Sequence, residues 1–280
     1  MTPVEVRIRR VVIGFADSGA AVGNVIATAA EFARVLEVEL WGLFIEDALV
    51  FAAAEWPHQR AIEPRALQWR ALTAAGNAEA HALAARAVER HLLGEAAALG
   101  IAAGFQIVRG EPAAALTQRL EPSDLLVFAE PADPIARVLP PYPRLVRALH
   151  ETAAAVLYVP HGARRKSGPV VAFAQSANDP ALELAASVAT GPHERLIVLA
   201  MGGAAAEQAI AQAARERVAG AVTLRLDTRG TDRWQDAAKR ALERYRERVL
   251  VVSRAAVADD LARYLRLAGE RAAPLLLAAG

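Results

Sequence analysis

The chain has 280 residues, of which 54% are hydrophobic and 22% charged, so it is long enough for two ordinary domains with a core each. Its formal net charge of +1 gives no reason to expect nucleic acid or an acidic substrate as a partner. It contains no cysteine, which excludes a disulfide framework, thiolate catalysis and a cysteine-based zinc site. No apolar segment approaches the ~20 residues that span a bilayer, and the N-terminus lacks the pattern of a secretory leader. We therefore expect a soluble, cytoplasmic protein that does not bind membranes.

In the first half, short β-branched segments alternate with longer segments of helical period. This pattern is typical of a parallel sheet with crossover helices. The predicted strands are 11–15, 40–45, 103–108, 125–128 and 155–159. The predicted helices are 21–36, 79–99, 113–120 and 144–152, and Gly100 ends the second of them. Residues 48–75, which contain Trp56 and Trp69, are predicted to be an insertion with one or two short helices.

The second half repeats this order of elements. Residues 161–169 contain glycine, proline and three consecutive cations, and they are interpreted as a solvated linker. The predicted strands after it are 170–174, 196–200, 222–226, 249–252 and 274–277. The predicted helices are 180–190, 204–218, 234–247 and 256–267. The internal duplication predicts two domains, residues 1–160 and residues 170–280.

Several segments of the first half have the order of motifs found in one family. The first strand ends in Gly14-Phe15-Ala16-Asp17-Ser18, which is similar to a strand ending in Asp-Gly-Ser. Residues 108–113, Val-Arg-Gly-Glu-Pro-Ala, resemble a stretch that closes a third strand and opens a helix. Residues 124–128 and 155–159 resemble the fourth and fifth strands that follow. In this order the segments resemble the universal stress protein family, and the second half resembles it by the order of its elements.

The resemblance implies an α/β fold of two tandem, doubly wound parallel sheets with five strands each in the order 3-2-1-4-5. Such sheets bind ligands beyond the carboxyl ends of the strands where the strand order reverses, here between strands one and four. The resemblance therefore implies a ligand site in the first half, with ATP or AMP as the candidate cofactors. Its candidate residues are Asp17, Ser18, Gly110, Ala129 and Glu130. Asp17 would accept a hydrogen bond from an adenine amino group or a ribose; the alternative is that Asp17 and Ser18 cap the next helix.

The sequence departs from the family in the phosphate loop after strand four. Nucleotide-binding members have Gly-x-x-Gly there and a later Gly-Ser or Gly-Thr, because glycines let amide groups approach phosphate. This chain has Ala129-Glu130-Pro131-Ala132 in the first half and Ser253-Arg254-Ala255-Ala256 in the second. Proline lacks an amide donor, and the Glu130 carboxylate would repel a polyphosphate. We therefore do not expect ATP binding of the usual kind. The second half, which has Gln175-Ser176-Ala177 in place of the aspartate, is predicted to be the more degenerate.

Other polar residues have ordinary explanations. Glu46-Asp47 with the nearby His58 could hold a metal or a cationic ligand, but a solvated loop anchored by Trp56 is the preferred interpretation. His81 and His91 are ten residues apart, so they do not share a helix face as a metal pair would. Residues 233–248 interleave both signs of charge, as a solvent-exposed helix does. No metal site is therefore predicted.

Three functions remain open. The first is a non-catalytic binding or regulatory protein with a small-molecule ligand in the first half. Its halves would form an intramolecular pseudo-dimer through their apolar fifth strands, and a homodimer is a further possibility. The second is an adenine-nucleotide-binding or -hydrolysing enzyme, although the sequence has no catalytic constellation. The third is a structural or protein-interaction module with decayed pockets, which side chains filling the crevice would favour.

Overall fold

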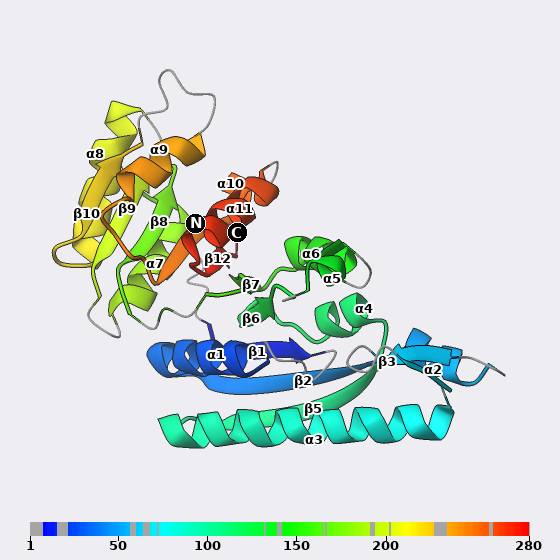
Figure 1. Ribbon diagram of the computed structural model, residues 1–280. Helices are drawn as coiled ribbons and strands as arrows, with labels where there is room; N and C mark the ends of the chain where they lie inside the picture. Colours follow the sequence, from blue (N-terminus) through cyan, green and yellow to red (C-terminus); the bar gives the residue numbers. More distant parts are fainter. Residues whose placement is uncertain are drawn as a thin grey trace.

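One continuous sheet of ten strands runs through the described part of the chain, in the computed structural model of Figure 1. The structure describes residues 8–15, 22–56, 60–63, 68–71, 73–131, 133–138, 142–163, 165, 167–190, 194–201, 203–226, 234–257 and 260–279. The strand order is β10-β9-β8-β11-β12-β7-β6-β1-β2-β5, and a separate hairpin pairs β3 with β4.

The first half contributes seven of the described strands and six helices. The strands of the main sheet are β1 (Arg10–Phe15), β2 (Glu39–Asp47), β5 (Ala103–Gly110), β6 (Asp124–Ala129) and β7 (Ala155–Val159). The hairpin consists of β3 (Arg60–Glu63) and β4 (Gln68–Ala71). The helices are α1 (Val22–Leu36), α2 (Ala48–Ala54), α3 (Ala74–Leu99), α4 (Pro112–Thr117), α5 (Pro134–Val138) and α6 (Tyr142–Glu151).

The second half contributes five described strands and five helices. The strands are β8 (Val170–Ala174), β9 (Leu196–Ala200), β10 (Val222–Arg225), β11 (Val249–Ser253) and β12 (Leu275–Ala278). The helices are α7 (Pro180–Thr190), α8 (Ala204–Arg217), α9 (Trp234–Ala241), α10 (Arg254–Val257) and α11 (Leu261–Arg271).

Each half is a doubly wound parallel sheet, as the sequence predicts. Counted along the main sheet within its own half, the strand order is 3-2-1-4-5 in both, and all of these main-sheet pairs inside a half are parallel. The two fifth strands, β7 and β12, pair antiparallel, with Leu157 opposite Leu276. The edge contact expected between the apolar fifth strands is therefore present, and it merges the two five-stranded sheets into one.

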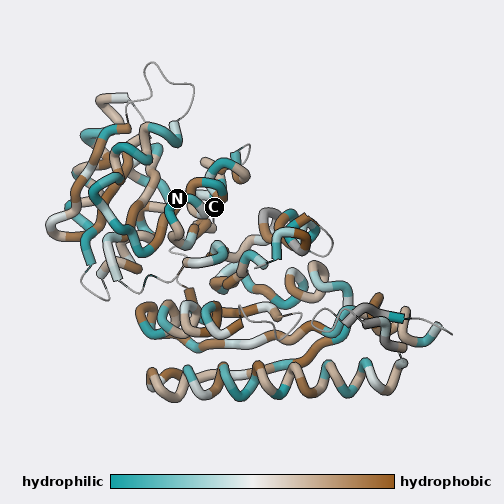
Figure 2. The backbone as a smooth tube through the Cα atoms, in the orientation of Figure 1, coloured by the Kyte–Doolittle hydropathy of each residue, from teal (hydrophilic) through white to brown (hydrophobic). Residues whose placement is uncertain are grey.

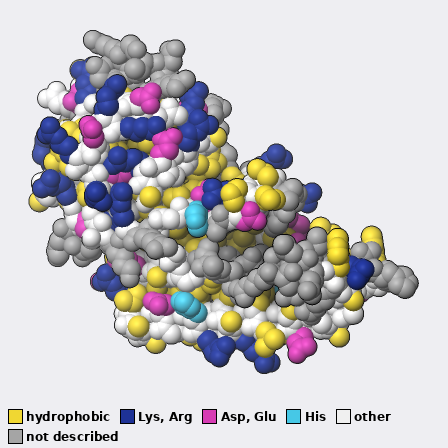
Figure 3. Space-filling view, in the orientation of Figure 1, with side chains coloured by type: hydrophobic (Ala, Val, Ile, Leu, Met, Phe, Trp, Pro, Cys, Tyr) yellow, Lys and Arg dark blue, Asp and Glu magenta, His cyan; other side chains and the backbone are white. Residues whose placement is uncertain are grey.

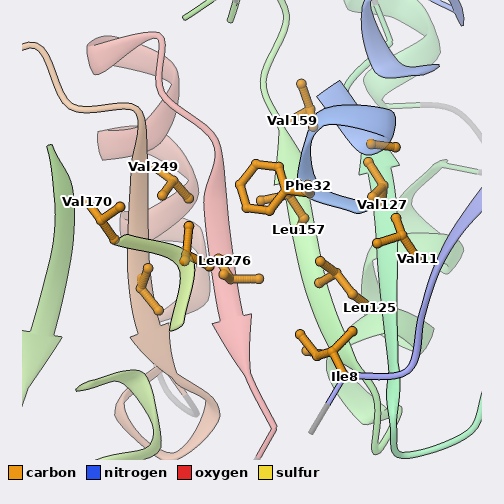
Figure 4. Packing of buried hydrophobic residues seen from close by; sticks show 14 of the residues in the cluster. Ile8, Val11, Phe32, Leu125, Val127, Leu157, Val159, Val170, Val249 and Leu276 are labelled. Atoms are coloured by element: carbon orange, nitrogen blue, oxygen red, sulfur yellow. The ribbon is translucent and has the colours of Figure 1, made fainter. Parts of the chain in front are cut away.

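Two apolar layers cover the two faces of this sheet, and each extends across the join. The helices α1, α3, α7 and α8 pack on one face, and α4, α6, α9 and α11 pack on the other. Central strands such as β7, β8 and β11 are buried along their whole length, because helices cover both faces of a parallel sheet. Figure 4 shows Val249 and Leu276 of the second half beside Phe32 and Leu157 of the first. Figure 2 shows hydrophobic residues concentrated along the strands and on the helix faces toward them.

The insertion after β2 differs from the prediction of short helices alone. Helix α2 begins where the Asp47 carboxylate accepts the amide of Leu49 at 2.9 Å. The next element is the hairpin, with Ile62 opposite Trp69. Aromatic and β-branched residues favour strands, and here that preference prevails over the short helical pattern.

Helix α3 starts earlier than predicted and ends as predicted. The hydroxyl of Thr73 accepts the amide of Gly76 at 3.1 Å, so the helix begins at Ala74 instead of Glu79. Gly100 ends it with φ of 68°, a left-handed conformation that glycine adopts without strain.

Helix α9 is shorter than the predicted 234–247 because a distant arginine binds the carbonyls beyond its end. The Arg271 guanidinium donates to the carbonyls of Leu242 and Tyr245 at 2.9 and 2.8 Å, and it forms a bidentate pair with Glu247. The predicted helix 256–267 is two helices in the structure, α10 and α11.

The linker is more than a solvated connector, since Arg165 donates to the Glu247 carbonyl at 3.1 Å. Among the described residues no helix is long and apolar enough to cross a bilayer.

Candidate functional site

The crevice of the first half lies where β1 and β6 are neighbours and the strand order reverses. Asp17 and Ser18, at the predicted centre of this site, lie outside the described residues. Gly110 ends β5 opposite Asp47, and β2 separates it from β1. A Cβ at Gly110 would lie 3.6 Å from that of Ala115, an ordinary contact, so no close approach requires glycine here. Of the candidates described, only Ala129 and Glu130, at the end of β6, directly adjoin the crevice.

The side chain of Glu130 is held by two other segments, and its backbone by a third. One carboxylate oxygen accepts the amide of His161 at 2.8 Å, and the other lies 3.1 Å from the Arg137 guanidinium. Arg137, on α5, also donates to the Pro131 carbonyl at 2.8 Å. The backbone amide of Glu130 donates to the Val159 carbonyl at 2.9 Å. The segment after strand four is therefore closed by hydrogen bonds of its own and presents an acidic group where a phosphate loop would present free amides.

Three aromatic rings cover the end of β6 beside Glu130. Tyr142, the first residue of α6, stacks on Phe128 with ring centroids 5.4 Å apart and an interplanar angle of 20°. Its hydroxyl lies 3.1 Å from that of Tyr158 on β7. Burial is the main reason that the pKa values of both tyrosines are raised above their ordinary value. Both hydroxyls therefore stay protonated at neutral pH and add no charge to the crevice.

A close contact of α4 covers the end of β1. A Cβ at Gly14 would lie 2.7 Å from a methyl group of Leu116, so this leucine sits where a larger β1 residue would project. Leu116 is 3% exposed, which places it within the apolar layer of this face. The Leu116 side chain thus occupies the space beside Gly14 near the end of β1.

In the second half, the crevice is filled by aromatic side chains. Phe173 of β8 contacts Trp234 and Tyr264, with ring centroids 5.8 and 5.5 Å away. Trp234 and Tyr264 are themselves 4.3 Å apart, and Tyr264 is only 2% exposed. The turn after β8 is closed as well, because the Asp179 carboxylate accepts the amides of Gln175 and Ala181. Side chains of β8, α9 and α11 thus pack together at this end of β8.

Arg254 stands at the place of the phosphate loop in the second half, and its side chain points away into the first half. It donates to the carbonyl of Leu149 at 3.0 Å and to that of Ala154 at 2.6 Å. Desolvation by burial lowers the pKa of its guanidinium. Ser253, just before it, is 3% exposed.

The acidic pair after β2 serves local structure. Glu46 accepts two hydrogen bonds from Arg109, at 2.9 and 3.0 Å, and Asp47 caps α2. His81 packs its ring 5.0 Å from that of Phe51, and His58 lies outside the described residues. No group of three or more potential metal ligands occurs among the residues that the structure describes.

Comparison with known proteins adds structural relatives only. No protein-family model and no curated protein sequence matches the chain. A universal stress protein from Archaeoglobus fulgidus DSM 4304 superposes with a TM-score of 0.63 at 12% identity, over 98% of this chain and 97% of that one. A putative universal stress protein from Pseudomonas aeruginosa UCBPP-PA14 superposes with a TM-score of 0.54 at 13% identity, over 98% and 94%. A functionally unknown protein from Pseudomonas aeruginosa PAO1 gives 0.53 at 13% identity, over 98% and 93%.

The chain has the universal stress protein fold. Since the first of these matches covers nearly the whole of both chains, the likeness extends over both halves and across the join between them. At such low identity it shows the fold alone, so the function has to be argued from this chain's own residues.

The sequence did not predict the residues that close the first crevice of this universal stress protein fold. Tyr142, Tyr158 and Arg137 were not among the candidates, although Tyr158 lies in the predicted fifth strand. The available signal was the position of Tyr158 near the carboxyl end of a strand beside strand four. Tyr142 and Arg137 gave no such signal, since α5 was not predicted and α6 was expected to begin two residues later.

Proposed function

We propose that this chain is a non-catalytic regulatory protein that acts by binding another protein, with both nucleotide crevices filled by its own side chains. The proposal includes two units, residues 1–160 and 170–280, joined by the linker 161–169, with the second serving as the structural partner of the first. The observation that carries it is the closure of both segments after strand four, by Glu130 in the first half and Arg254 in the second. A triphosphate would have to displace these contacts and would meet the Glu130 carboxylate.

The surface of the first half supports a protein partner. Large hydrophobic side chains that are well exposed, among the described residues, all lie between positions 49 and 138. The most exposed belong to the insertion, the first half of α3, and α5: Leu49, Trp56, Trp69, Leu83, Ile135 and Val138. Figure 3 shows hydrophobic side chains at the surface of the end that carries the insertion. Contiguous exposed apolar surface is typical of interaction sites, and the restriction of these side chains to the first half is what favours a protein partner there.

Thermal unfolding with and without ATP, ADP and AMP, each with magnesium, tests the proposal. A ligand that binds only the folded state raises its apparent stability, by ~2.7 kcal/mol at one hundred times its dissociation constant. We expect no rise in melting temperature with any of the three at millimolar concentration. A rise that grows with the number of phosphates would contradict the proposal.

A second candidate function is binding of a small ligand without phosphates in the first half. The Glu130 carboxylate, which is paired with Arg137, lies there with the hydroxyls of Tyr142 and Tyr158, and this set favours a neutral molecule. Adenosine added to the same thermal measurement tests it. A rise with adenosine that Asp17→Ala removes would favour this function over a protein partner. Thermal stability unchanged by adenosine would leave the first proposal.

A further inference from the structure

The helix that closes the first crevice is held at its far end by the second half. Helix α6 carries Tyr142 at its N-terminus, where the ring stacks on Phe128 at 5.4 Å. Leu149 lies in the last turn of the same helix, and its carbonyl accepts the Arg254 guanidinium at 3.0 Å. A single helix thus joins a residue in the crevice of one half to a residue of the other half.

The Arg254 guanidinium donates to two backbone carbonyls of the first half. Its second hydrogen bond, of 2.6 Å, goes to the carbonyl of Ala154, which directly precedes β7. The Leu149 carbonyl lies in the last turn of α6, where a helix leaves its last carbonyls without helical partners and where a cation is favoured, and the Ala154 carbonyl lies in the short connection that follows. The two bonds therefore hold the end of α6 against the start of β7.

Opening the crevice requires a movement of α6, and this movement would break the bond between Arg254 and Leu149. Tyr142 covers Phe128 and lies 3.1 Å from the Tyr158 hydroxyl, so exposing these two residues requires α6 to move. Leu145 and Leu149, which are 8% and 4% exposed, anchor the helix in the apolar layer between its two ends. A rigid movement of α6 away from the sheet would carry the Leu149 carbonyl away from Arg254.

We infer that Arg254 is a latch through which the second half keeps α6 closed over the crevice of the first. The inference rests on the proposed function, in which this crevice is closed in the resting protein. It explains why the place of the phosphate loop in the second half holds a long cationic side chain directed at the other half. Displacement of Arg254, by a partner that draws the segment after β11 away, would free α6 and expose Phe128 and Tyr158.

Hydrogen–deuterium exchange of the full-length protein, read by mass spectrometry, tests the latch. Arg254→Met removes the donors and keeps an apolar side chain of similar length. We expect amides of residues 145–154 to exchange about tenfold faster, since exchange follows the local opening equilibrium, while α7 is unchanged. Unchanged exchange in residues 145–154 of the folded variant would overturn the inference.

Two further variants make the result specific. Arg263→Met, on the neighbouring α11, removes an exposed arginine that pairs with Asp260 at 3.1 Å and should leave residues 145–154 unaffected. Arg254→Lys keeps the charge but has fewer donors, so the exchange rate of residues 145–154 should rise less, about two- to threefold. This variant replaces Arg254→Met in the test if Arg254→Met does not fold. Equal effects of Arg254→Met and Arg263→Met would overturn the latch. Because no nucleotide is present, this result is independent of the thermal test of the proposed function.

Discussion

At the scale of single residues, buried charges decide how the second half is held together. Glu247 is fully buried and forms a bidentate pair with Arg271, with both distances 2.7 Å. Its second oxygen lies 3.8 Å from Arg165 of the linker. One carboxylate thus connects the linker, the segment before β11 and the end of α11.

Replacing Glu247 should be costly. Glu247→Ala would leave two guanidinium groups facing a site without a carboxylate, and we expect a loss of about 3–5 kcal/mol in the free energy of unfolding. Urea denaturation measures this loss. The matched control is Glu270→Ala, which removes an exposed carboxylate paired with Lys239 and should cost less than ~1 kcal/mol. Similar losses for the two variants would contradict the assigned role of Glu247.

Buried tyrosines should make stability depend on alkaline pH. Burial raises the pKa values of Tyr158 and Tyr264 above their value of 10.0 in an unfolded chain. Below about pH 10 both states hold these protons; above it the unfolded chain loses them while the folded protein keeps them, so stability falls.

We expect a fall of about 1.4 kcal/mol per pH unit for each such tyrosine, starting near pH 10. Urea denaturation between about pH 9 and pH 11 measures the slope. Tyr264→Phe removes one titrating hydroxyl, and its slope should be shallower than that of the unmodified protein. A variant with the same slope would show that Tyr264 does not contribute.

At the scale of elements, α3 offers two glycines with opposite requirements. Gly94 lies inside the helix with nothing within 4 Å of a Cβ built on it. Gly100 ends the helix at a φ of 68°, where a side chain is strained even though the space around it is open.

The two substitutions by alanine should therefore change stability in opposite directions. Gly94→Ala should add about 0.5–1 kcal/mol by favouring the helix, and Gly100→Ala should remove about 1 kcal/mol by straining its end. Thermal or urea unfolding of the two variants side by side provides the measurement. A gain from Gly100→Ala would show that the end of α3 rearranges without cost.

At the scale of the whole molecule, the two halves are joined on both faces of the sheet as well as through β7 and β12. Arg248, which precedes β11, is 2% exposed and lies 3.1 Å from Glu194. Its other nitrogen is 3.7 Å from Glu31 on α1 of the first half, and its guanidinium lies over the ring of Phe32. Arg254, which follows β11, crosses to α6 on the opposite face.

With these contacts we expect the protein to unfold in one cooperative transition. Trp234 is the tryptophan of the second half, so replacing Trp41, Trp56 and Trp69 by phenylalanine leaves a fluorescent reporter there. Its urea midpoint should coincide with that of the far-ultraviolet circular dichroism signal, which reports both halves. Separate midpoints would show that the halves unfold independently.

The regular part of this fold could be predicted from local patterns. Strands β7, β8 and β9 and helix α7 have the predicted bounds, because continuous apolar segments and helical periodicity express burial directly. The hairpin β3–β4 and helix α5 were not predicted, and the predicted end of α9 was wrong. Each is short or is set by contacts distant in the sequence, as the end of α9 is by Arg271.

For the candidate site, the sequence located the segments but not their contacts. The sequence of residues 129–132 already showed that the phosphate-loop glycines are absent and that an acidic residue, Glu130, stands in their place. The partners of Glu130 could not be predicted, because His161 is 31 residues away and Arg137 belongs to a helix that was not predicted.

By itself, the sequence determined the class of the sheet, its duplication and the apolar fifth strands, since these follow from periodicity and composition. Only the tertiary structure decided that the two fifth strands pair antiparallel into one sheet, that Trp234 and Tyr264 pack together in the second half, and that Arg254 reaches α6. The physical reason is range. Hydrophobic periodicity reports burial within an element, whereas a hydrogen bond between residues 105 positions apart exists only once the chain has brought both ends together.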